Sequence, residues 1–348
     1  MESLGAYVVE GLLIALVLYS LWVFFAAYMM YRQERRSYGE VGFARAFFFS
    51  LFCLYGSMIC CVLVLPVIVF ERGTKSVKVR NTAFQKNQQV SKKIFRFFFG
   101  DPVVQGLENL PQEGDRPVVF VMNHQSMVDV ALSFFLDRRF AFVSKAITFL
   151  LPGAGTLMRL CHFVPLKRGN KASILRMFEK CAQAMESDCN IVIFPQGTRK
   201  RHEWVPFKDG AFSFAVDNNY TVVPVTLALP ADLWTARRRP RRGGGGGGGG
   251  GGPPGRCVLT VHPPQRPPPG GRREGGKAVG ANGGAAATAA LREACQKSVC
   301  EALPDGYFSN NDTYVSVTKS SSMLLAANQT DSSSLEETLV ISDERHLV

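Results

Sequence analysis

The first stretch that could carry chemistry is a seven-residue segment from Asn123 to Asp129, in which Asp129 follows His124 by five positions. The apolar residues 117–122 before it are typical of a buried strand, and residues 130–136 after it favour a helix. His124 would then stand at a strand end, with the carboxylate about one helical turn further on. An Asp–His pair fixes the imidazole tautomer and leaves its second nitrogen available as a general base. The alternative is a capping Asn, a surface His and an unrelated Asp.

Basic residues follow the other strand-like stretches of the same region. Lys145 follows one such stretch, Arg168 follows the next, and Arg199 ends the turn after a third. Because strand ends in an open α/β sheet converge on one crevice, we expect these cations to lie near His124 and Asp129. A base beside several cations suits a phosphate-bearing substrate with a hydroxyl group to deprotonate. Taken singly, each cation is better interpreted as a solvated surface charge, so the inference depends on their joint placement.

The elements that must position these residues alternate between strand-like and helix-like from about residue 117 to residue 230. This alternation predicts an α/β fold with a mostly parallel sheet flanked by helices. The strand candidates are residues 118–122, 140–143, 163–166, 190–194 and 221–227.

Two uncharged runs, residues 11–31 and 46–70, are each long enough to cross a bilayer. They predict an N-terminal two-helix membrane region. Basic residues stand at both ends of the second run, so the orientation stays open. Either one of the helices spans the membrane, or the pair forms a hairpin that dips into one leaflet.

Changes in composition divide the chain further. Ten consecutive glycines from Gly243 to Gly252 follow an arginine-rich run, and Pro- and Gly-rich sequence continues beyond them. Such sequence buries too little apolar surface to fold. We expect a membrane region at 1–72, a catalytic domain at 73–236, a low-complexity insertion at 237–290 with a possible strand at 257–262, a short helix at 291–304 and a disordered tail at 305–348.

The net charge of the 348-residue chain is +12 and its pI is about 9.4, so its partners should be anionic. Phosphate-bearing ligands and acidic membrane lipids fit, whereas nucleic acid does not, because the apolar runs draw the chain into a bilayer. The nine cysteines show no regular spacing, which favours reduced thiols facing the cytosol. No cluster of His, Cys and Asp has the spacing of metal ligands, so we expect no metal.

Four blocks of sequence resemble those of the membrane-bound glycerolipid acyltransferases, most closely the lysophosphatidic acid acyltransferases. That family carries NHxxxxD, a block ending in Arg, FPEGTR and V/I-P-V, in this order. Here Asn123–Asp129, Phe163–Arg168, Phe194–Arg199 and Val223–Val225 match them. The resemblance covers about residues 103–229, and the stretch 206–212 resembles the family's sequence after the third block.

The resemblance implies a role for each matched residue. His124 would be the general base that deprotonates the acceptor hydroxyl, whose oxygen then attacks the thioester of acyl-CoA, and Asp129 would orient His124. Acyl-CoA would be a co-substrate, with no cofactor. The residues that the resemblance assigns to substrate binding are Asn123, Lys145, Arg168, Gln196, Gly197, Thr198 and Arg199.

Gln196 stands where the family usually has Glu. Glutamine keeps the size and one carbonyl acceptor but removes the charge. If the family's Glu accepts a hydrogen bond from an acceptor hydroxyl or supports a neighbouring cation, Gln196 does the same more weakly. This departure affects the identity and affinity of the acceptor more than the chemistry.

The resemblance implies acyl transfer from acyl-CoA to the sn-2 hydroxyl of lysophosphatidic acid, which gives phosphatidic acid. We expect a membrane protein of the endoplasmic reticulum whose catalytic domain faces the cytosol. One alternative is the same transfer to glycerol 3-phosphate or to another lysophospholipid. Another is a catalytically weak, lipid-binding membrane protein.

Overall fold

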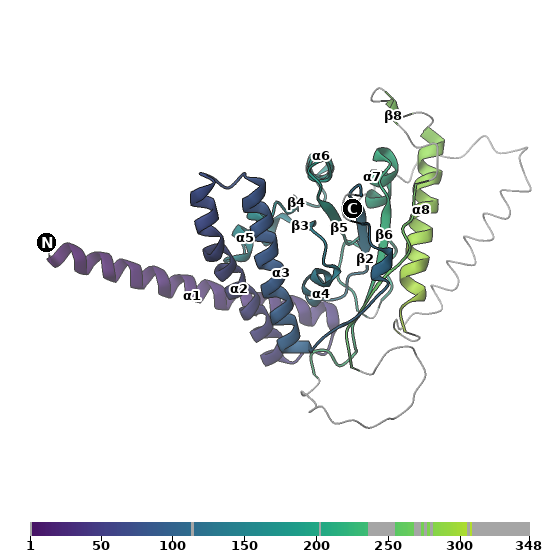
Figure 1. The fold of residues 1–348 in the computed structure, drawn as a ribbon. Coiled ribbons are helices and arrows are strands. Elements are labelled where there is room, and N and C mark those ends of the chain that lie inside the picture. Colours follow the sequence, from purple (N-terminus) through teal and green to yellow (C-terminus); the bar gives the residue numbers. More distant parts are fainter. Residues whose placement is uncertain are drawn as a thin grey trace, which may run out of the picture.

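The computed structural model describes residues 2–112, 115–201, 203–235, 255–267, 273–274, 277–278, 281–304 and 307. A seven-stranded sheet forms the centre of the molecule, in the order β1-β7-β6-β2-β5-β3-β4 (Figure 1). All neighbouring strands in this sheet run parallel except β6 and β7, so the predicted mostly parallel sheet is confirmed. The strands are β1 (Val103–Gln105), β2 (Val119–Met122), β3 (Phe140–Lys145), β4 (Val164–Leu166), β5 (Asn190–Ile193), β6 (Val222–Ala228) and β7 (Val258–Val261).

Strand β2 lies in the middle of the sheet, between β5 and β6. Its Val119 pairs with Ile191 on one side and with Val222 on the other. Every residue of β2 and of β6 is buried, which explains why both strands are almost entirely apolar. The strand end that carries His124 is therefore held from both sides.

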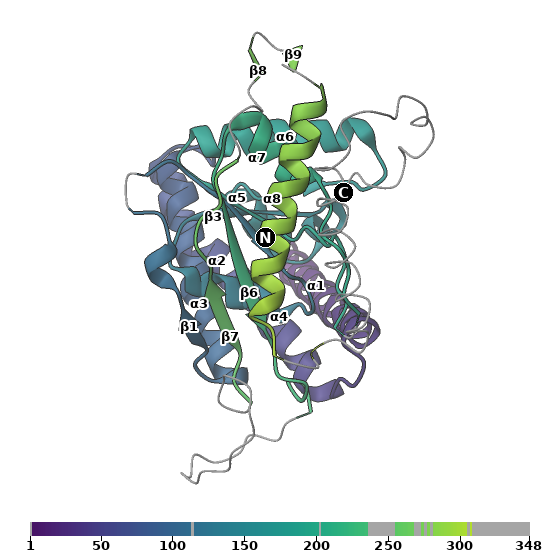
Figure 2. The same ribbon diagram turned by 90° about the vertical axis from the view of Figure 1, so that its right-hand side faces the viewer.

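Helices cover both faces of the sheet (Figures 1 and 2). One face carries α3 (Val77–Phe99), α4 (Val128–Ser133) and α5 (Ala154–Leu160), and α3 contacts both of the others. The other face carries α6 (Lys171–Glu186), α7 (Gly210–Asn218) and α8 (Ala281–Glu301). Right-handed crossovers between parallel strands explain this division, because the chain moves along the sheet in one direction before β4 and in the other after it. Short 3₁₀ helices lie at η1 (Leu107–Asn109), η2 (Phe134–Leu136) and η3 (Ala146–Leu150).

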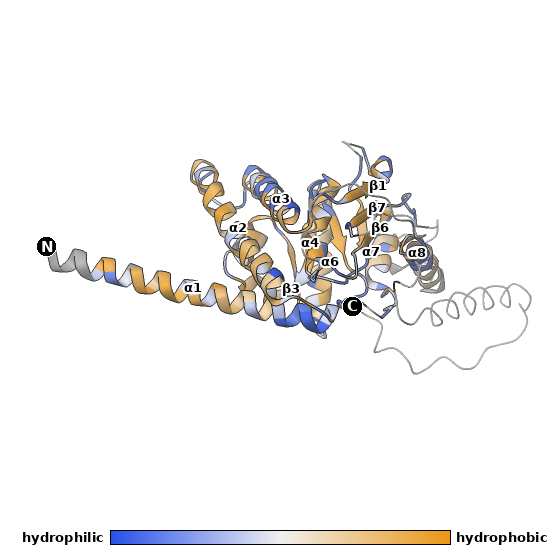
Figure 3. Cartoon of the chain, turned by 90° about the horizontal axis from the view of Figure 1, so that it is seen from below, coloured by the Kyte–Doolittle hydropathy of each residue, from blue (hydrophilic) through white to orange (hydrophobic). Residues whose placement is uncertain are grey.

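The two N-terminal helices, α1 (Glu2–Tyr38) and α2 (Phe43–Phe70), are long and apolar enough to cross a membrane. Only 6% of the most apolar window of α1 and 22% of that of α2 are buried in the protein. Figure 3 shows α1 as mostly hydrophobic, with its most hydrophilic stretch where it reaches the catalytic domain. This polar end extends the helix to Tyr38, since the Arg, Gln and Glu residues there favour a helix.

The C-terminal part differs from the sequence prediction in one element. The helix expected at 291–304 begins ten residues earlier, at Ala281, because alanines dominate residues 285–290 and have the highest helix propensity. The predicted insertion contributes β7 to the sheet, between β1 and β6, and a small hairpin of β8 (Arg273–Glu274) and β9 (Lys277–Ala278). The glycine run at 243–252 and the tail after residue 307 lie outside the described residues.

Candidate active site

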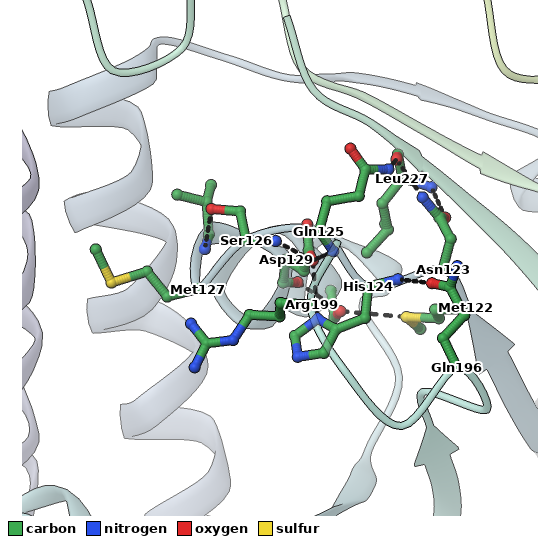
Figure 4. A network of polar contacts seen from close by, with 12 residues as sticks. Met122, Asn123, His124, Gln125, Ser126, Met127, Asp129, Gln196, Arg199 and Leu227 are labelled. Atoms are coloured by element: carbon green, nitrogen blue, oxygen red, sulfur yellow. Dashed lines mark hydrogen bonds and ion pairs between the residues drawn. The ribbon is translucent and has the colours of Figure 1, made fainter. Parts of the chain in front are cut away.

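The structure brings His124 and Asp129 together at the carboxyl end of β2. Nδ1 of His124 lies 2.9 Å from Oδ2 of Asp129 (Figure 4). The same oxygen accepts the backbone N–H groups of Gln125, at 2.6 Å, and of Ser126, at 2.8 Å. Asp129 is fully buried. With three donors on one oxygen the carboxylate is fixed, so Nδ1 of His124 donates to it and Nε2 is the nitrogen left for chemistry.

The surroundings of His124 favour its neutral form. Burial lowers the pKa of His124 below its usual 6.5. The hydrogen bond and the charge of Asp129 oppose this effect, while Arg199 and Arg168 add to it. The imidazole also stacks on the ring of Phe194, with 4.1 Å between the centroids. A neutral imidazole at neutral pH has the protonation state that a general base needs.

The backbone of His124 is held by the turn that follows β5. Its N–H donates to Oε1 of Gln196 at 2.6 Å, and Nε2 of Gln196 donates to the carbonyl oxygen of Val205 at 3.1 Å. Gln196 is buried. Its side chain therefore does not line the cavity described below, although the sequence predicted that it binds substrate. Both ends of its amide are used by backbone groups, so Gln196 positions the base.

Asn123 likewise points away from the cavity. Its Nδ2 donates to the carbonyl oxygen of Leu227, and its Oδ1 accepts the N–H of Leu227, each at 2.8 Å. Asn123 is buried, and the pair ties the end of β2 to β6 (Figure 4). The predicted substrate contact of Asn123 is thus replaced by a link between two strands. A buried amide satisfies its polar atoms where backbone groups are available.

The remaining predicted residues converge on one cavity of about 450 Å³. His124 lies on its wall. Its polar wall also contains Lys145, Arg168, Gly197, Thr198 and Arg199. The apolar wall comes from α2, α3, η2 and α5 and includes Phe49, Leu54, Ile94, Phe134, Leu157 and Met158. One cavity therefore joins a candidate base, a cluster of cations and a surface that suits a hydrocarbon chain.

The cations of this cavity repel one another. Burial lowers the pKa of Lys145, and the nearby Arg168 and Arg199 lower it further. Burial and then Arg199 lower the pKa of Arg168 in the same way. Within the described part of the chain, neither Lys145 nor Arg168 forms an ion pair with a carboxylate. An anionic group bound between them would relieve this repulsion.

Sequence reasoning missed Lys208, which lines the same cavity. Burial and the charge of Arg168 lower its pKa. The backbone of Gly197 has a φ of 69°, and a Cβ there would lie 3.5 Å from Nζ of Lys208. The positive φ favours glycine, whereas a Cβ at this position would make only an ordinary contact with the lysine. The signal was present in the stretch 206–212, which follows the third block.

Sequence reasoning also missed Glu34, near the polar end of α1. Glu34 is fully buried and accepts hydrogen bonds from Ser126 Oγ, from Met127 N at 2.9 Å and from Trp234 Nε1 at 3.1 Å. Nη1 of Arg199 lies 3.2 Å from Oε2 of Glu34. The N-terminal helix is therefore part of the site. In the sequence, Glu34 lies among several arginines that follow the apolar run. This pattern is typical of the charged residues that flank a membrane helix, so it gave no sign of a role in the site.

Comparisons with known proteins give a family match and several similar sequences. Residues 101–228 match the acyltransferase family model. A chloroplastic 1-acyl-sn-glycerol-3-phosphate acyltransferase of Brassica napus is 33% identical over 51% of this chain and 52% of its own length. The human 1-acyl-sn-glycerol-3-phosphate acyltransferase alpha is 26% identical over 56% of this chain and 68% of its own length.

A crystal structure of the 1-acyl-sn-glycerophosphate (LPA) acyltransferase of Thermotoga maritima aligns with 73% of this chain and 97% of its own, at a TM-score of 0.47 and 23% identity. An Arabidopsis thaliana relative is 38% identical, over 35% of its own length. The chain thus spans about half, or less, of the length of these two plant relatives. Residues 101–228 are thus similar to the acyltransferase family, and the relatives named here are 1-acyl-sn-glycerol-3-phosphate acyltransferases.

Proposed function

We propose that the protein transfers a fatty acyl chain from acyl-CoA to the sn-2 hydroxyl of lysophosphatidic acid and so forms phosphatidic acid. One observation carries this proposal. Nε2 of His124, whose ring is fixed by Asp129, belongs to a cavity that has cations on one part of its wall and apolar side chains on another. The cations suit the phosphate of the acceptor, and the apolar wall suits an acyl chain. The names of the relatives point to the same reaction.

The reaction proceeds by attack of the acceptor oxygen on the thioester. Nε2 of His124 takes the proton of the sn-2 hydroxyl as its oxygen bonds to the thioester carbonyl carbon. The C–S bond then breaks, and the CoA sulfur leaves as a thiolate and takes the proton from the imidazolium. An ester replaces the thioester, and free CoA is released. Asp129 stabilises the imidazolium that forms between the two steps.

The cations would set the position of the acceptor. Lys145, Arg168 and Arg199 line the cavity together with the Gly197–Thr198 turn. A phosphate held by two guanidinium groups and an ammonium is fixed in orientation, which brings the neighbouring hydroxyl to the base. Lys208, from the segment before α7, adds a fourth positive charge to the same wall.

The acceptor is identified by an acyl-CoA assay on purified membranes with a panel of acceptors. We expect lysophosphatidic acid to have the highest kcat/KM. Higher efficiency with glycerol 3-phosphate or with a head-group lysophospholipid would replace the acceptor and leave the acyl transfer in place. Binding of these lipids without turnover of any of them would make the protein a lipid-binding member of the family.

The location of the protein is a separate proposal. Two helices long enough to cross a membrane support action at a bilayer. No disulfide joins cysteines in the described part of the chain, which suits a catalytic domain on a reducing side. We propose the endoplasmic reticulum with this domain facing the cytosol, although some relatives are described as chloroplastic. Imaging of a tagged protein with organelle markers, and protease protection of the tag, test this.

A further inference from the structure

A second cavity, of about 650 Å³, lies at the opposite edge of the sheet from the candidate active site. Its wall includes residues just before three neighbouring strands: Arg139 before β3, His162 before β4 and Cys189 before β5. The candidate active site instead lies at the carboxyl ends of these strands. Only Phe163 lines both cavities. The two are therefore separate places in the fold.

The second cavity is strongly basic. Its wall carries Arg80 from α3, Arg139, Arg159 from α5, His162 and Lys180 from α6. No carboxylate is among its lining residues in the described part of the chain. Three helices and the start of β3 thus direct the arginine and lysine charges into one space. If these groups served only to hold the fold together, carboxylates would be expected beside them.

Two of the guanidinium groups have buried donors that the protein does not satisfy. Nε of Arg80 and Nη2 of Arg139 are buried and have no hydrogen-bond acceptor among the described residues. The neighbouring Arg138 differs, because its Nε donates to the carbonyl oxygen of Pro111 and its Nη1 to that of Asp137, each at 3.2 Å. A buried donor without an acceptor costs about 1–3 kcal/mol, and more if charged. Arg80 and Arg139 thus each keep one donor without an acceptor among the described protein groups.

The groups in this cavity also repel one another. Burial lowers the pKa of Arg80, and the charge of Arg139 lowers it further. Burial, Arg80 and Arg139 together lower the pKa of His162. A neutral His162 can still donate one ring N–H. An anion with several oxygen atoms would compensate these charges and accept hydrogen bonds from the donors that face the cavity.

We propose that this cavity is a binding site for a phosphate group, in which Arg80 and Arg139 are the main donors. The proposal goes beyond the proposed acyl transfer and does not depend on it. A phosphate oxygen pair matches the fork of a guanidinium group, and two such groups with Arg159 and Lys180 nearby outweigh its charge.

The head group of an anionic phospholipid and a soluble phosphate both carry these oxygen atoms. The two sources are distinguished by testing a phospholipid and inorganic phosphate separately.

The test uses the full-length chain and the double variant Arg80→Gln, Arg139→Gln. Thermal unfolding is measured in bilayers of phosphatidylcholine alone, in bilayers that also contain phosphatidylglycerol, and in detergent with and without inorganic phosphate. Phosphatidylglycerol is chosen because it is neither the proposed acceptor nor the proposed product. The control is Arg176→Gln, which removes an exposed charge from α6 outside the cavity.

We expect phosphatidylglycerol to raise the Tm of the wild type and of Arg176→Gln. In the double variant, the apparent affinity for the anion should fall at least about tenfold, because two charged hydrogen-bonding groups are lost. If inorganic phosphate also raises the Tm of the wild type, a phosphate group is sufficient for binding without the rest of the lipid. If only phosphatidylglycerol raises the Tm, the lipid is the source of the bound phosphate.

The Tm of the double variant without any anion separates a binding site from a structural cluster. Removal of unsatisfied, mutually repelling charges should leave this Tm unchanged or raise it. A lower Tm in phosphatidylcholine alone would show that the arginines hold the fold together. That result, or an anion response equal to that of the wild type, would overturn the proposal.

Discussion

Arg199 and Glu34 form an ion pair of 3.2 Å between segments that lie 165 residues apart in the chain. Arg199 belongs to the turn after β5 that lines the candidate active site, and Glu34 lies near the polar end of α1. Glu34 also accepts the N–H of Met127, within the segment that carries the base. The helix that could cross the membrane therefore helps to set the position of a cation that we assign to the acceptor phosphate.

Replacing Glu34 by Gln should weaken acceptor binding more than the chemical step. Glutamine retains the size of the side chain but removes the charge that holds Arg199. We expect the KM for lysophosphatidic acid to rise by roughly tenfold, with a smaller change in kcat, because one charged hydrogen bond is weakened. Steady-state kinetics at saturating acyl-CoA measure both constants. An unchanged KM would show that Arg199 does not need this partner.

Replacing Glu34 by Ala separates stability from catalysis. It leaves Arg199, Trp234 Nε1 and the N–H of Met127 without their acceptor. Loss of one partner of a buried ion pair costs about 3–5 kcal/mol, so the Tm should fall clearly. In Glu34→Gln the Tm should fall less, because the amide oxygen can still accept hydrogen bonds from Met127 N or Trp234 Nε1. A fall as large as in Glu34→Ala would contradict a role for these hydrogen bonds and would assign the stabilisation to the charge alone.

Gln196→Glu tests the observation that residue 196 positions the base. A carboxylate can still accept the N–H of His124, but its second oxygen would face the carbonyl oxygen of Val205, which now accepts from Nε2. We expect stability to fall by about 1–3 kcal/mol, with little change in the KM of the acceptor. Chemical denaturation measures the change in stability, and steady-state kinetics measure the KM of the acceptor. A lower acceptor KM at unchanged stability would instead place residue 196 in direct contact with the acceptor.

The pH dependence of kcat/KM should report the protonation of His124. The neutral imidazole is the base, so activity is lost as the pH falls through its pKa. Burial lowers this pKa below 6.5, and the acidic limb of the profile should therefore lie below pH 6.5. Asp129 raises the pKa, so Asp129→Asn should shift the limb to lower pH and reduce the maximal rate about 10²–10⁴-fold. If the acidic limb of Asp129→Asn lies at the same pH as that of the wild type, Asp129 does not set the pKa of His124.

The sheet and the convergence of the site were predictable from the sequence. The buried strands read as apolar, β-branched runs because helices cover both faces of the sheet. Lys145 ends β3, and Arg168 and Arg199 follow β4 and β5. The carboxyl ends of parallel strands share one edge, so these side chains line one cavity. These features depend on local patterns and on a general rule of topology.

The roles of the buried polar residues were not predictable in the same way. Asn123 and Gln196 lie inside matched blocks, yet their amides pair with the backbone of Leu227, His124 and Val205. The side to which an amide points depends on neighbouring backbone groups that come from distant parts of the chain. Glu34 was missed for the same reason, since its partners become neighbours only when α1 packs on the domain.

The central claim is that His124 is the base of an acyl transfer, and the variant His124→Ala tests it most directly. The variant and the wild type are purified in membranes, matched for expression and Tm, and assayed with acyl-CoA and lysophosphatidic acid. Removal of a general base should lower kcat by roughly two to four orders of magnitude, with little change in the KM of the acceptor. Activity near that of the wild type in a correctly folded His124→Ala preparation would contradict the claim.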